Sequence, residues 1–165
     1  MYCNVLTKFE LIMKRMKTKL LILLALPLLF YACKKDTYQT KPQLSIKSVN
    51  SKTLKQGDLL LFQLSFTDAE GDIQDTLWVQ KISRTCPGTA GAQFISKNRV
   101  PDFTPTSNLK GILEIGYVYN ANVQGYSSIT GCGTKNDTAY FKFWLKDKGK
   151  NVSDTISSEN IVLLK

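Results

Sequence analysis

Two segments of the chain alternate apolar and polar residues along their length. From Leu60 to Phe66 every second residue is a leucine or a phenylalanine, and from Ala139 to Leu145 the same alternation runs through alanine, phenylalanine and leucine. A period of two places all of these side chains on one face of an extended strand. Since such a face has to be covered, the two segments predict a pair of core strands.

Four further strands are expected between positions rich in Gly, Pro, Asn and Asp. They cover Leu44–Val49, Thr76–Ser83, Gly111–Tyr119 and Thr155–Leu164. The segment from Cys86 to Asn108 is rich in turn-forming residues, so it is expected to be irregular, with one short edge strand near Gln93 to Ser96. No long stretch after Cys33 shows a helical period. The pattern predicts an all-β chain in which residues 43–165 form a β-sandwich.

The amino-terminal part has the order of a secretory signal. An apolar segment from Leu20 to Ala32 ends at Cys33 and is shorter than the roughly 20 residues that a membrane-spanning helix needs. A basic run precedes it, made up of Lys14, Arg15, Lys17 and Lys19. We therefore expect residues 1–32 to be a signal peptide, with translation starting at Met13 or Met16 as an alternative to Met1.

The end of this segment, Leu29-Phe30-Tyr31-Ala32-Cys33, resembles a bacterial lipobox, with Tyr31 bulkier than the small residue usual at its place. The resemblance implies that the thiol of Cys33 is acylated and that the protein is attached to a membrane through this lipid. Residues 33–42 are short of apolar groups and lack periodicity, so they are expected to be a tether.

The composition of the chain indicates which classes of partner to expect. The chain carries a formal net charge of +9, part of which lies in the basic run of the signal. It contains no Lys and Arg cluster interleaved with aromatic residues of the kind that follows nucleic acid, so no nucleic-acid partner is expected. Of the cysteines after Cys33, Cys86 and Cys132 remain, either as a disulfide in an oxidising compartment or as two free thiols.

Two motifs resemble lipoproteins of the Bacteroidota whose exported part is an immunoglobulin-like or cadherin-like sandwich. They are Phe66-Thr67-Asp68-Ala69-Glu70-Gly71-Asp72-Ile73, preceded by Gly57-Asp58, and the segment from Phe143 to Ser153. The resemblance implies an outer-membrane lipoprotein that faces the periplasm or the cell surface. In immunoglobulin strand order, the loops after Phe66 and after Lys146 emerge at one end of the sandwich, and Cys86 and Cys132 meet at the other.

The first of these loops offers carboxylates on alternate residues, Asp68, Glu70 and Asp72, and the second loop adds Asp147. Ca²⁺ favours such sets because six to eight oxygens must converge on it. The alternative is a solvated turn whose aspartates bond their own backbone. A calcium ion here would stiffen the tethered end of the domain.

The aromatic residues Tyr117, Tyr119, Tyr126, Tyr140 and Trp144 form a second set. Open rings on a sheet face stack against sugars, which would fit a carbohydrate-binding accessory lipoprotein of a polysaccharide uptake system. The same residue types are also ordinary strand residues that pack into a core.

Three Asp-Thr-aliphatic sequences resemble the O-glycosylation acceptor of exported Bacteroidota proteins. Their threonines are Thr76, Thr138 and Thr155. The same sequence is also a common way for a turn to enter a strand.

Catalysis is not expected, because the chain has no histidine and its acids cluster in one turn. The chain is expected to be a lipid-anchored binding, structural or adhesion module with an unknown protein or glycan partner.

Overall fold

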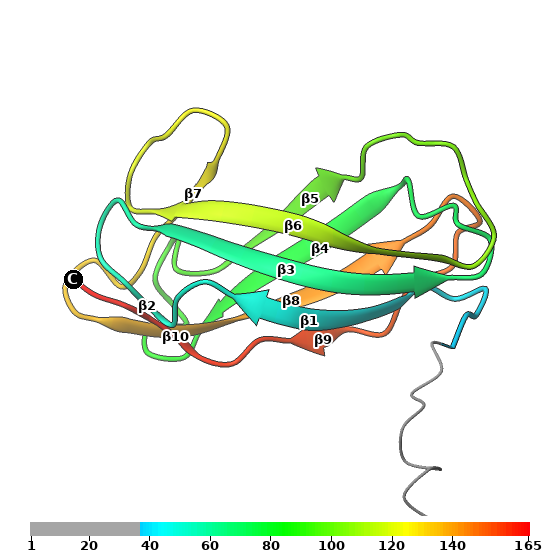
Figure 1. The fold of residues 1–165 in the computed structure, drawn as a ribbon. Coiled ribbons are helices and arrows are strands. Elements are labelled where there is room, and N and C mark those ends of the chain that lie inside the picture. The colour runs from blue at the N-terminus through cyan, green and yellow to red at the C-terminus, as the bar shows by residue number, and fades with distance from the viewer. Residues whose placement is uncertain (1–36) are drawn as a thin grey trace, which may run out of the picture. The chain divides into compact units, whose positions relative to one another are not determined.

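The structure, a computed structural model, describes residues 37–165, and within this range it contains ten strands and no helix. The strands form two sheets packed face to face (Figure 1). The predictions for residues 1–36, including the signal peptide and the acylation of Cys33, lie outside the described residues. Among residues 37–165, no helix is long and apolar enough to cross a membrane.

The first sheet has the order β1-β3-β6-β7. Its strands are β1 (Gln43–Val49), β3 (Leu59–Asp68), β6 (Leu109–Tyr119) and β7 (Ser127–Ile129). The pairs β1–β3 and β3–β6 are antiparallel, whereas the short β7 runs parallel to β6.

The second sheet has the order β2-β10-β8-β4-β5, with β9 also pairing to β8. Its strands are β2 (Thr53–Leu54), β4 (Thr76–Ser83), β5 (Phe94–Arg99), β8 (Asp137–Lys146), β9 (Ile156–Ser157) and β10 (Ile161–Leu163). The strand expected over Thr155–Leu164 is divided into β9 and β10, and residues 158–160 between them are not part of a strand.

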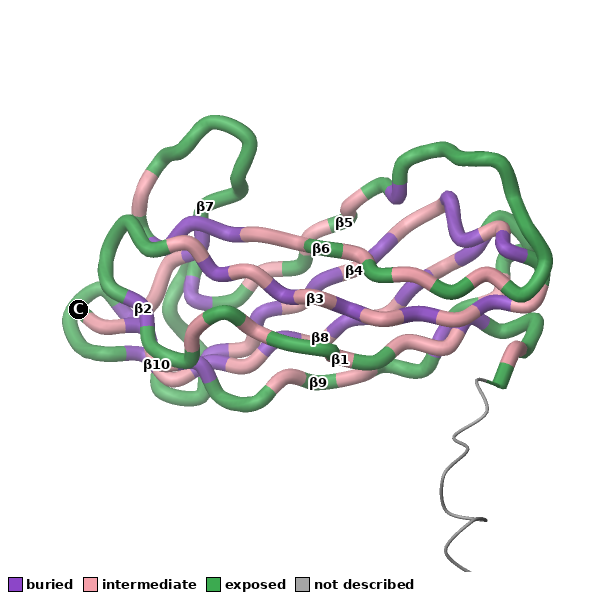
Figure 2. Tube along the Cα trace, viewed as in Figure 1, coloured by how far each residue is buried: buried purple, intermediate pink, exposed green. Residues whose placement is uncertain are grey.

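The core lies between the two sheets, as the buried positions along β3, β4 and β8 show (Figure 2). β3 and β8 bury every second residue, as the alternation predicts. At the centre, the ring of Phe62 lies 5.0 Å from the rings of both Phe141 and Phe143, centroid to centroid. Such tilted contacts favour one arrangement of the two sheets beyond the apolar area that they bury.

A disulfide between Cys86 and Cys132 joins the segment after β4 to the segment before β8, with the two Cα atoms 5.7 Å apart. The chain-entropy model gives about 4 kcal/mol for closing a loop of this length. Next to it, the buried ammonium of Lys81 lies 3.1 Å from Oδ2 of the buried Asp137, whose Oδ1 accepts a hydrogen bond from Ser83. This end of the sandwich is therefore held by a covalent link and a buried ion pair.

Candidate functional site

At the opposite end of the sandwich from the disulfide, two loops meet. The loop that follows β3 contacts the loop that follows β8, because the backbone N–H of Lys148 donates to the carbonyl of Asp72 at 2.9 Å. The backbone N–H of Gly149 donates to the carboxylate of the same residue at 3.1 Å. The first loop thus accepts two hydrogen bonds from the second, which fixes their positions relative to each other.

Three of the four carboxylates expected at this end come together. Asp68, Asp72 and Asp147 each place one carboxylate oxygen within 4.8 Å of the others. The fourth, Glu70, is exposed in the loop and does not belong to this group. We call Asp68, Asp72 and Asp147 the carboxylate cluster.

Asp68 is the most unusual member of the cluster because its side chain is fully buried, with 0% of its surface exposed. Its Oδ2 accepts hydrogen bonds from the backbone N–H groups of Gly71 (2.6 Å) and Asp72 (3.1 Å). Its Oδ1 is buried and has no hydrogen-bond partner within residues 37–165. Burial, and to a lesser extent the charges of Asp72 and Asp147, raise the pKa of Asp68 above its ordinary value.

Asp147 is also fully buried. Its two oxygens accept hydrogen bonds from the backbone N–H of Asn151 (2.7 Å) and from the side-chain amide of the same residue (2.9 Å). The carboxylate is therefore held in one orientation by its own loop. Each oxygen keeps a second lone pair, so these bonds leave the carboxylate able to bind a cation.

Gly71 allows the first loop to take its path. It has a φ of 71°, and a Cβ placed on it would lie 2.1 Å from the carbonyl oxygen of Thr106, in the connection between β5 and β6. Only glycine avoids both the left-handed strain and this collision. The turn that brings Asp72 back toward Asp68 thus requires glycine at this position.

The cluster lies beside the place where the chain enters the domain. The backbone N–H of Ala69 donates to the carbonyl of Gln39 at 3.0 Å, and the hydroxyl of Thr67 donates to the carbonyl of Thr37 at 3.1 Å. The part of the expected tether that the structure describes, residues 37–42, therefore lies against the domain.

A hard divalent cation suits the cluster. Carboxylate oxygens are the ligands that Ca²⁺ and Mg²⁺ prefer, and Ca²⁺ accepts the more irregular sets of six to eight oxygens. A cation bound here would reduce the repulsion among the three carboxylates, and Asp68 has a buried oxygen without a hydrogen-bond partner in residues 37–165. The second group of potential ligands, Cys86, Cys132 and Asp137, does not suit a metal because its two sulfurs are joined in the disulfide.

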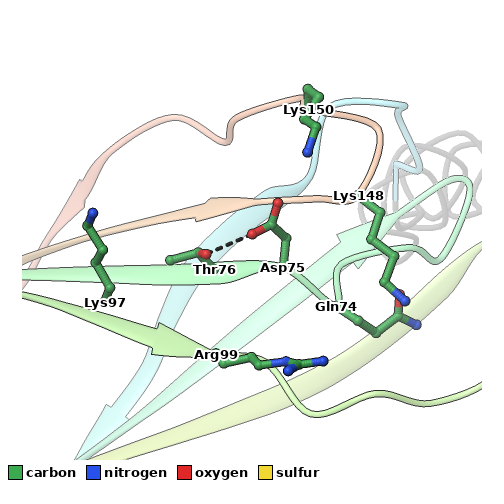
Figure 3. A pocket seen from close by; sticks show the side chains of 7 residues that line it. All are labelled: Gln74, Asp75, Thr76, Lys97, Arg99, Lys148 and Lys150. Atoms are coloured by element: carbon green, nitrogen blue, oxygen red, sulfur yellow. Dashed lines mark hydrogen bonds between the residues drawn. The ribbon is translucent and has the colours of Figure 1, made fainter.

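Figure 3 shows a basic pocket, and one of its residues, Lys148, bonds through its backbone to Asp72 of the carboxylate cluster. The pocket has a volume of about 440 Å³ and is open to solvent. Its four cations come from two places in the chain: Lys97 and Arg99 lie on β5, and Lys148 and Lys150 lie in the loop after β8. The remaining lining residues are Gln74, Asp75 and Thr76. We call this the basic pocket.

Two of the five aromatic residues expected to offer a platform for a sugar are not at the surface. Tyr117 and Tyr119 are buried in the core, at 1% and 4% exposed, as the packing interpretation expects. Burial raises the pKa of the Tyr117 phenol, which lies 3.0 Å from the hydroxyl of Ser96. Tyr126, at 40% exposed, lies beside Gly116, where an added Cβ would come within 2.7 Å of its ring.

The outward-facing rings on the second sheet are half-buried and contact their neighbours. Trp144 stacks on Trp78, with ring centroids 5.7 Å apart and planes at 11°, and the ammonium of Lys97 lies over the Trp78 ring at 4.5 Å. The guanidinium of Arg84 lies over the Tyr140 ring at 4.8 Å. A sugar that stacked on Trp144 or Tyr140 would therefore compete for a ring face with these side chains or use the opposite face.

The three threonines of the Asp-Thr-aliphatic sequences lie in different surroundings. Thr76 begins β4, lies in the basic pocket and donates a hydrogen bond to Asp75 at 2.7 Å. Thr138 is the second residue of β8 and is half-buried. Thr155 is exposed just before β9, so it is the most accessible of the three for modification.

Comparison with known proteins finds little that is similar. No protein-family model matches the chain, and no curated protein matches it either. Among solved structures, Spo0M, a sporulation control protein from Bacillus subtilis, superposes with a TM-score of 0.42 and 6% sequence identity. The match covers 76% of this chain but 50% of Spo0M, so the chain spans half the length of that protein.

Sequence reasoning misses the basic pocket of the site and the buried Lys81 at the disulfide end of the sandwich. The basic pocket joins residues of β5 to a loop some fifty positions later, and only the pairing of β4 with both β5 and β8 brings them together. The buried Lys81 does leave a signal, since it continues the inward alternation of Leu77 and Val79 along β4. A charged residue at such a position requires a buried partner.

Proposed function

We propose that the protein is a lipid-anchored, non-catalytic module of the cell envelope, with a binding or structural role, whose tethered end is stiffened by Ca²⁺. The observation that carries the proposal is the buried carboxylate of Asp68, which has one unpartnered oxygen and belongs to a cluster of three acids beside the segment that leads to Cys33. In this proposal the chain is an outer-membrane lipoprotein of the Bacteroidota type.

The order of the strands supports an immunoglobulin-like sandwich. The arrangement β1-β3-β6 in one sheet and β10-β8-β4-β5 in the other corresponds to strands A-B-E and G-F-C-C′ of such domains. The disulfide differs from the usual bridge between strands B and F, because it joins the segment after β4 to the segment before β8. It nevertheless fits an oxidising compartment, as an exported protein requires.

A non-catalytic role is supported by the side chains available. The chain has no histidine, and the three clustered acids bond to backbone groups and to each other's loops instead of facing a substrate cleft. The burial of Tyr117 and Tyr119 removes two of the rings that a carbohydrate-binding role would use, whereas Tyr126 is exposed and Tyr140 and Trp144 are half-buried.

The anchor is tested by metabolic labelling. Cells expressing the full chain are grown with radioactive palmitate, and the protein is expected to carry the label, to fractionate with membranes, and to lose both properties in Cys33→Ser. A Cys86→Ser and Cys132→Ser double variant is the matched control for loss of cysteine and is expected to keep the label. Label that persists in Cys33→Ser would refute the anchor.

The cation is tested separately, on the mature chain with Cys33→Ser. Millimolar Ca²⁺ is expected to raise the melting temperature, and a chelator is expected to lower it again, because the ion binds only the folded state. The combination Asp68→Asn with Asp72→Asn is expected to remove the response. An unchanged melting curve across the titration would show that the cluster is an acidic turn that binds no Ca²⁺.

A further inference from the structure

We propose that the basic pocket binds the phosphate of anionic phospholipid head groups, so that the domain docks against the membrane that holds its lipid. The pocket consists of the side chains around Lys97, Arg99, Lys148 and Lys150. The inference rests on the proposed acylation of Cys33, which fixes where the domain has to be.

The first step of the argument is the length of the tether. The carbonyl of Thr37 accepts a hydrogen bond from Thr67, and the carbonyl of Gln39 accepts one from Ala69, so the chain is fixed to the domain from residue 37 onward. Only three residues separate Thr37 from Cys33. Whatever their conformation, they extend at most about 14 Å. An acylated Cys33 therefore keeps this end of the sandwich at the bilayer surface.

The second step is the position of the pocket at that end. Ala69, which bonds Gln39, is three residues before Asp72, and Asp72 accepts hydrogen bonds from the backbone of Lys148 and Gly149. The loop that bears Lys148 and Lys150 is thus bonded to the same loop that is bonded to the tether. The basic pocket and the attachment point lie at the same end of the domain.

The third step is charge. The four cations of the basic pocket are all exposed, and Lys150 makes no side-chain hydrogen bond or ion pair within residues 37–165. Asp75 is the acid in the lining, and it is occupied by Thr76 and, at 3.9 Å, by Lys146. The pocket therefore carries a net positive charge in a volume that accommodates a phosphate.

Asp102 competes for two of these cations. It lies 2.5 Å from Arg99 and 3.3 Å from Lys148, at the solvent-exposed rim. Exposed pairs of this kind contribute little, so a membrane phosphate can take the place of the Asp102 carboxylate. A basic patch beside a lipid anchor is a common further contribution to membrane binding, and the basic pocket lies near the tether.

The experiment uses the mature chain with Cys33→Ser, which carries no lipid, and vesicles of phosphatidylcholine with and without one-third phosphatidylglycerol. Sedimentation of protein with the vesicles is expected only when phosphatidylglycerol is present and is expected to weaken in high salt. Removing each charge is expected to weaken binding about fivefold. The combination Arg99→Gln, Lys148→Gln and Lys150→Gln is therefore expected to weaken binding on the order of a hundredfold.

The matched control removes three exposed lysines, through Lys55→Gln, Lys135→Gln and Lys165→Gln. They lie before β3, before β8 and after β10, whereas the cluster and Lys148 lie in the loops that follow β3 and β8. The control changes the net charge equally and is expected to bind as the parent does. Asp102→Asn is expected to bind more tightly, because it removes the competing carboxylate.

The inference would be overturned if the pocket variant and the control lost vesicle binding equally. It would also be overturned if the protein sedimented equally with vesicles that contain phosphatidylglycerol and with vesicles that lack it. Binding to an acidic polysaccharide but not to vesicles would also overturn it and would assign the pocket to a glycan. Because the protein used is unacylated, these outcomes are independent of palmitate labelling. If the protein is labelled with palmitate but does not bind vesicles, the lipid anchor stands and the docking of the pocket is rejected. If it binds vesicles but is not labelled, the anchor is rejected and head-group binding by the pocket stands.

Discussion

Asp68→Asn should stabilise the domain without calcium and destabilise it, relative to the parent, with calcium. In the parent, Oδ1 of Asp68 is buried without a partner in residues 37–165, and an orphaned buried group of this kind costs about 1–3 kcal/mol. Asparagine keeps an oxygen for the N–H groups of Gly71 and Asp72. Its amide nitrogen then donates toward the neighbouring carboxylates, which are within 4.8 Å.

The two effects have sizes that can be measured. A gain of about 1–2 kcal/mol in chelator corresponds to a rise in melting temperature of about 4–8 °C for a domain of this size. For the parent, Ca²⁺ at a hundred times its dissociation constant adds about 2.7 kcal/mol, or about 10 °C, whereas the variant should gain almost nothing. Differential scanning calorimetry at neutral pH, with chelator and then with millimolar Ca²⁺, gives both values.

The same variant tests the titration of the cluster. Because burial raises the pKa of Asp68, the folded state binds more protons than the unfolded state above pH about 4. The calcium-free parent should therefore lose stability relative to Asp68→Asn as the pH rises through the raised pKa, and the difference should vanish below pH 4. Glu70→Gln, an exposed neighbour outside the cluster, is the control and should behave as the parent. Equal calcium responses in parent and Asp68→Asn, with the variant less stable in chelator, would refute this account.

Two further substitutions test the supports at the two ends of the sandwich. Lys81→Met leaves the charge of buried Asp137 unpaired, so the free energy of unfolding in urea should fall by about 3–5 kcal/mol. Adding Asp137→Asn should recover part of the loss, and a purely additive double variant would contradict the pairing. Gly71→Ala should cost more stability than Gly57→Ala, because both have positive φ but only Gly71 faces a carbonyl at 2.1 Å. Equal melting temperatures for the two alanine variants would show that the close approach does not matter.

The sheets were largely predictable because alternation is a local signal. Leu60 to Phe66 and Ala139 to Leu145 match the cores of β3 and β8, and Thr76–Ser83 coincides with β4. The short strands β2 and β7 were not predicted, because two or three residues cannot show a period. They are strands only through their pairing with β10 and β6.

The candidate site was predictable to the extent that strand order determines which loops meet. Asp72 and Asp147 come together because the ends of β3 and β8 lie at one end of the sandwich. Glu70 lies outside the cluster. The spacing of the acids could not predict this, because it does not specify the turn that the backbone makes at Gly71. The basic pocket was not predictable, because its halves are joined through strands whose pairing no local pattern specifies.

The most direct test of the calcium site is a calorimetric titration of the mature Cys33→Ser chain with Ca²⁺. The account predicts one ion per domain with a dissociation constant in the micromolar to millimolar range, and no detectable heat of binding in Asp68→Asn with Asp72→Asn. Failure of the parent to bind at millimolar Ca²⁺, or binding that the double variant retains, would contradict it.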